Sequence, residues 1–84
     1  MRQEIFQKAL EETKKAQSIK GDWPVFQSII SQLEYLIDLE NGKTADKSRL
    51  KDITLGVLAV KNLEDTYPEL AVVIEKASAE ARKM

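Results

Sequence analysis

The residues best placed to do chemistry are two carboxylates, Glu34 and Asp38, which stand four positions apart in a segment of helical periodicity. That spacing puts both side chains on one face of a helix, where they can share a divalent cation. A metal site in a helical bundle takes further ligands from a second helix, commonly in a Glu-x-x-His pattern. The 84-residue chain contains no histidine, so the sequence predicts neither a metal site nor a cofactor.

The composition also argues against catalysis. Without cysteine or histidine, the chain lacks a thiol nucleophile, disulfides and the commonest general base. Paired carboxylates that hydrolyse glycosides need an enclosing cleft, which a bundle of this length scarcely forms. Gly56 belongs to no phosphate-binding glycine pattern. We therefore predict that the protein is not an enzyme.

The charge distribution points instead to a docking surface. Between residues 22 and 42 the chain carries four acids and no lysine or arginine. Three of these acids, Glu34, Asp38 and Glu40, fall in the last two turns of a predicted helix, where the dipole disfavours negative charge. Tyr35 flanks the same stripe. This pattern predicts an acidic face with an aromatic anchor, although such faces are often only solvated and such tyrosines are often packed.

A second acidic group surrounds the start of the last predicted helix. Asp65 and Glu69 favour the dipole there, so capping is the first interpretation and docking the second. The complete set of predicted partner-binding residues is Glu34, Tyr35, Asp38, Glu40, Asp65 and Glu69.

Four segments of helical periodicity must position these residues. They are predicted to be helices over 2–20, 23–40, 47–63 and 67–82. Gly21 ends the first, and Asp22 is expected to cap the second, with Pro24 in its first turn. Gly42 and Pro68 mark the other two breaks. The sequence predicts an all-α fold, a compact antiparallel bundle of four helices forming one domain over residues 1–84.

The third segment is the most distinctive, because its apolar residues fall on two faces. One stripe is Leu50, Ile53, Val57 and Val60, and the other is Leu55, Leu58 and Ala59. We therefore expect this helix in the middle of the bundle, capped by Asp46 or Ser48. An interior glycine costs about 1 kcal/mol relative to alanine, so we expect a close helix crossing at Gly56.

Nothing in the chain predicts a membrane or nucleic-acid partner. No apolar run reaches the length of a membrane span, and the first residues lack the apolar core of a signal peptide. The net charge of −1 gives no general attraction to nucleic acid. A cytoplasmic location is expected.

Residues 48–70, SRLKDITLGVLAVKNLEDTYPEL, carry a family resemblance. The run from Leu55 to Lys61, with the following LEDT and PEL, resembles the signature of a small all-helical immunity family of interbacterial competition. Its best-known member neutralises a type VI secretion effector that destroys NAD(P)+. The similarity continues more loosely through residues 32–36 and 46–50.

This resemblance implies a cytosolic antitoxin that binds the C-terminal domain of its cognate toxin and blocks the active site. Immunity to a nuclease or nucleotide-modifying toxin of another secretion system, and a homo-oligomeric adaptor module without catalysis, remain alternatives. For the antitoxin, we expect the acidic face around Glu34 and Asp38, with Tyr35 as anchor, to meet a basic cleft on the toxin.

Overall fold

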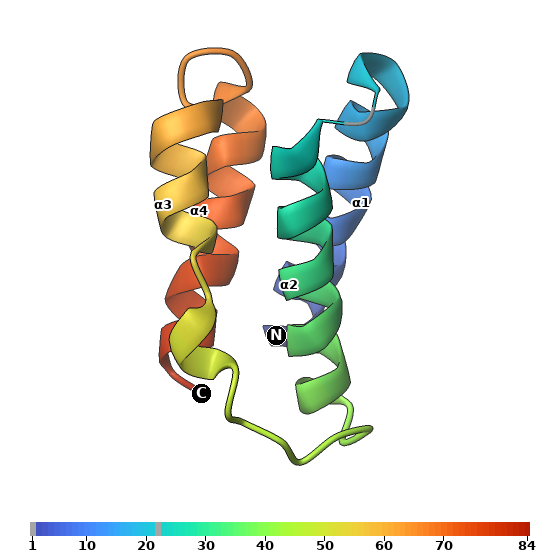
Figure 1. Cartoon of the computed structure of the whole chain (residues 1–84), viewed down its shortest axis with the longest axis vertical. Helices are drawn as coiled ribbons and strands as arrows, with labels where there is room; N and C mark the ends of the chain where they lie inside the picture. Colours follow the sequence, from blue (N-terminus) through green and yellow to red (C-terminus); the bar gives the residue numbers. More distant parts are fainter. Residues whose placement is uncertain (1, 22) are drawn as a thin grey trace.

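Four helices arranged as two neighbouring hairpins make up the computed structural model, which describes residues 2–21 and 23–84 (Figure 1). Helices α1 (Arg2–Lys20) and α2 (Pro24–Glu40) form the first hairpin. Helix α3 (Leu55–Leu58), continued by the π-helical turn η2 (Ala59–Leu63), forms the second with α4 (Pro68–Arg82). The described residues contain no strand, and the predicted all-α bundle of four helices is confirmed.

One apolar stripe from each helix fills the space between the hairpins. The largest fully buried apolar side chains are Phe6, Phe26, Ile29, Leu33, Leu36, Leu55, Leu63 and Ile74. Among them, Leu55 belongs to one of the two apolar stripes predicted for the third segment. None of the helices described over residues 2–21 and 23–84 is long and apolar enough to cross a bilayer.

The predicted ends of the first two helices are confirmed. Gly21 and Gly42 adopt positive φ angles of 101° and 77°, a conformation that glycine reaches without a steric cost. Pro24 occupies the first turn of α2. Asp22, the predicted cap, lies outside the described residues. The N-cap position of α2 belongs to Trp23, whose ring packs edge-on against Phe26 at 5.0 Å between centroids.

The helix predicted over 47–63 is wrong in nearly its first half, because the α-helix begins only at Leu55. The Asp46 carboxylate accepts a hydrogen bond from the Ser48 backbone N–H, so it organises a turn rather than a helix cap. A short 3₁₀ helix, η1 (Leu50–Asp52), follows.

A side chain from α2 explains why the third helix starts so late. The Gln32 carbonyl oxygen accepts a hydrogen bond of 2.8 Å from the Thr54 N–H, and its amide donates one of 3.0 Å to the Thr54 hydroxyl. In a continuous helix the same N–H would bond to the carbonyl of Leu50. Gln32 therefore replaces a hydrogen bond within the third helix by one that joins α2 to Thr54, the residue before that helix.

The expectation that the third helix is central is also wrong. Leu55, Ala59 and Leu63 are fully buried, but Val57 and Val60 are 53% and 55% exposed. The helix contacts α4 and α2 and lies at an edge of the bundle, so only one of its apolar stripes finds a neighbour. The π turn, closed by a hydrogen bond from the Glu64 N–H to the Ala59 carbonyl, keeps Ala59 and Leu63 on the buried side.

The close crossing expected at Gly56 is confirmed. A Cβ placed on Gly56 would lie 3.0 Å from Ser78 Oγ and 3.4 Å from Arg82 Nη2, both on α4. Glycine lets the backbone of α3 approach α4 at this point.

This contact predicts a specific coupling between Gly56 and Ser78. The change Gly56→Ala should gain about 1 kcal/mol of helix propensity but lose most of it to the Ser78 hydroxyl. In a Ser78→Ala background the nearest remaining atoms are Arg82 Nη2 at 3.4 Å, the end of a flexible side chain, and the residue-78 Cβ at 3.6 Å, both ordinary contacts. Gly56→Ala should therefore raise the free energy of unfolding by about 1 kcal/mol more in that background, measured by urea unfolding with circular dichroism. Equal effects in both backgrounds would refute the contact.

Candidate partner-binding surfaces

The acidic stripe of α2 has the unpaired charge that a docking surface requires. Glu34 is exposed and Asp38 is half-buried. Neither carboxylate forms a hydrogen bond or ion pair with any described residue. Both are therefore available to cations of a partner.

Tyr35 already has partners within the chain. Its hydroxyl donates a hydrogen bond of 2.7 Å to the Asp46 carbonyl and accepts one of 3.3 Å from the Arg49 N–H. The Arg49 guanidinium lies over the ring, 5.2 Å from its centroid, where a cation–π attraction operates. Tyr35 thus fastens the loop between α2 and η1, and one face of its ring is covered.

Glu40 belongs to a charged cluster where the start of α1 meets the ends of α2 and α4. Arg2 contacts Glu40 at 3.5 Å and Glu80 at 3.4 Å, and Lys83 contacts Glu80 at 3.2 Å. The hydrogen bond that Lys83 donates holds the pKa of Glu80 below its ordinary value, and the hydrogen bond from Arg2 has a smaller effect in the same direction. Glu40 therefore joins helices within the chain.

Asp65 and Glu69 lie apart from the α2 residues. Both are exposed, and α4 begins without a side-chain cap, so Asp65 does not cap it. The turn between η2 and α4 lies at the opposite end of the molecule from the last turn of α2 (Figure 1). The structure therefore separates the six predicted residues into two groups.

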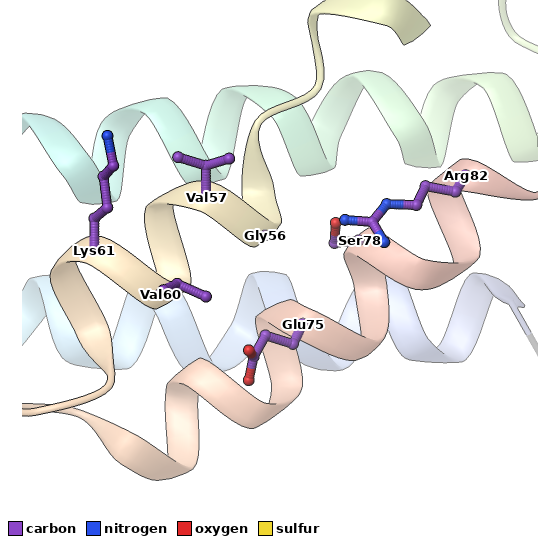
Figure 2. Close-up of a pocket in the computed structure, with 7 residues that line it drawn as sticks. All are labelled: Gly56, Val57, Val60, Lys61, Glu75, Ser78 and Arg82. Carbon is purple, nitrogen blue, oxygen red and sulfur yellow. The ribbon is translucent and has the colours of Figure 1, made fainter.

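A groove that the sequence pattern did not predict lies between the third helix and α4. It is lined by Gly56, Val57, Val60, Lys61, Glu75, Ser78 and Arg82, with a volume of about 450 Å³ (Figure 2). Its signal in the sequence is the apolar stripe that contains Val57 and Val60, which the helical pattern alone predicts to be buried. Among residues 2–21 and 23–84, no cluster of three or more acidic side chains can hold a metal ion.

Known proteins similar to this chain share its entire architecture. The family model Tsi6 matches residues 2–83. The structure of Tsi6 from Pseudomonas aeruginosa is similar with a TM-score of 0.91 and 27% identity, over 96% of this chain and 94% of that one. A chain in the structure of Tse6 in complex with Tsi6 gives a TM-score of 0.94 and 26% identity, over 99% and 88% respectively. No curated protein matches the sequence.

The contacts of Tyr35 predict a local loss of order when its hydroxyl is removed. Tyr35→Phe should lower the free energy of unfolding by about 0.5–1.5 kcal/mol and speed hydrogen exchange at the Arg49 amide. Tyr67→Phe is the matched control, because the Tyr67 hydroxyl bonds to no described residue. Equal exchange at Arg49 in the wild type and Tyr35→Phe would contradict the structural role of this hydroxyl.

Proposed function

This chain belongs to the Tsi6 family of type VI secretion immunity proteins, and we propose that it binds a Tse6-type toxin domain and blocks its active site. The observation that carries the proposal is the family match over residues 2–83, almost the whole chain. The family resemblance found in residues 48–70 is thereby confirmed. Members are inhibitors without catalysis of their own, which agrees with the prediction that this protein is not an enzyme.

The proposed target is a toxin that hydrolyses NAD(P)+, the activity associated with Tse6. The immunity protein then works in the cytoplasm, where this substrate is found. NAD(P)+ carries phosphates, so the cleft that binds it is expected to be electropositive.

The unpaired carboxylates of α2 complement such a cleft. We assign Glu34 and Asp38 to electrostatic steering, which raises the association rate and selects the partner. Tyr35 supports this face by fastening the adjacent loop. Glu40, Asp65 and Glu69 complete the proposed acidic set, and Glu40 also forms an ion pair with Arg2 within the chain.

The direct test is inhibition of NAD(P)+ hydrolysis. The probes are the toxin domain encoded in the adjacent reading frame and, separately, the toxin domain of Tse6. One equivalent of this chain should abolish hydrolysis by its cognate domain and protect cells that express that domain. Undiminished hydrolysis with both probes would refute the proposed function.

Steering by α2 predicts a kinetic effect of reversing its charge. Glu34→Lys combined with Asp38→Lys should lower the association rate about tenfold at low salt, with a smaller effect at high salt. Both positions are at least partly exposed, so circular dichroism should be unchanged. Glu11→Lys combined with Glu64→Lys, which makes the same change in net charge at exposed positions elsewhere, is the control. Full protection and an unchanged rate in the α2 variant would eliminate this assignment.

A further inference from the structure

We infer that the groove between the third helix and α4 is the centre of the toxin interface, and that it receives an apolar side chain flanked by a carboxylate. The inference rests on the proposed function and assigns that function a contact surface. It separates two tasks, because the groove holds the partner while the carboxylates of α2 steer it.

The exposed apolar residues favour this groove. Among the described residues four large apolar side chains are markedly exposed, and three of them, Val57, Val60 and Val72, belong to α3, η2 and α4. Val72 lies one turn before Glu75 on the same face of α4. The stripe of α2 is polar along its whole length. Because the centre of a protein interface is apolar and depleted in charge, α2 cannot supply it.

The shape of the groove suits an inserted side chain. Gly56 forms its floor, since a Cβ there would crowd Ser78 and Arg82. Figure 2 shows Val60 pointing toward α4 and the Arg82 side chain running toward Ser78, whereas the Val57 and Lys61 side chains extend from the third helix away from α4. The volume of about 450 Å³ exceeds that of any single side chain, so one large apolar group and its neighbours fit.

The charges around the groove indicate what accompanies the apolar group. The side chains of Lys61, Glu75 and Arg82 form no hydrogen bond or ion pair with any described residue. Two cations and one anion leave an excess of positive charge, which a carboxylate of the toxin outside its electropositive cleft would satisfy. Arginine beside an apolar contact is a frequent source of binding energy at interfaces.

The same excess of charge favours a toxin over a second copy of this chain. A second copy would bring the same excess of positive charge to the contact and no carboxylate in this groove beyond its own Glu75. An interface of standard size takes about 800 Å² from each partner. The whole molecule exposes 5239 Å², so such a contact centred on the groove covers only a small part of it.

The test compares dissociation and association rates of variants with the toxin domain that the wild-type chain inhibits. Val57→Asp combined with Val60→Asp should raise the dissociation rate about 30-fold or more, measured at high salt so that the two added carboxylates have little effect on the association rate. Arg82→Glu, which leaves the third helix untouched, should raise the dissociation rate about tenfold. Ile19→Asp is the matched control, because Ile19 is 88% exposed on α1 outside this groove. Circular dichroism verifies that each variant is folded.

Each outcome distinguishes this inference from the proposed function. If both folded groove variants dissociate at the wild-type rate while the wild-type chain still inhibits the toxin, the assignment of the groove as the interface fails and the proposed function stands. Loss of binding in Ile19→Asp instead would move the interface to the end of α1 and overturn the groove assignment as well. The inference would also be overturned if the wild-type chain formed a dimer and Val57→Asp combined with Val60→Asp dissociated that dimer without affecting toxin binding. If the wild-type chain inhibits neither toxin probe, the proposed function fails and this inference fails with it.

Discussion

The close packing of α3 on α4 at Gly56 is the contact on which the second hairpin depends. The third helix runs only from Leu55 to Leu63, too short to be stable in water without tertiary contacts. Its buried residues Leu55, Ala59 and Leu63 supply those contacts, and the missing Cβ at Gly56 lets them reach the core. Because one stripe is buried in this way, Val57 and Val60 remain on the surface.

Polar side chains fix the parts of the chain that the apolar core does not reach. Gln32 holds Thr54 at the start of the third helix, and Tyr35 holds the loop that precedes it. Arg2 joins the ends of α2 and α4 through Glu40 and Glu80. These contacts attach the two hairpins to each other and involve few of the exposed side chains. A rigid scaffold of this kind binds a partner with a small entropic cost of ordering.

An inhibitor without chemistry of its own acts through affinity and rate. The two surfaces suit different parts of that task, since unpaired charge acts over distance and exposed apolar area acts only on contact. The acidic stripe on α2 belongs to the first kind and the valine-lined groove to the second. The matched structures of Tsi6, at 26–27% identity, share the fold of this chain almost completely, so most of the sequence differences are compatible with the same packing.

Helical periodicity determined much of this protein without its structure. It predicted the bounds of α1, α2 and α4, because each has clear glycine or proline boundaries. The absence of cysteine and histidine and the signature in residues 48–70 led to a family of inhibitors.

Only the tertiary structure decided the rest. A pattern with two apolar stripes does not say which stripe finds a neighbour. The partners that Gln32, Tyr35 and Glu40 find outside α2 lie 11 to 38 positions away in the sequence. The exposure of Val57 and Val60 follows from the edge position of the third helix, which depends on packing between hairpins rather than on local sequence.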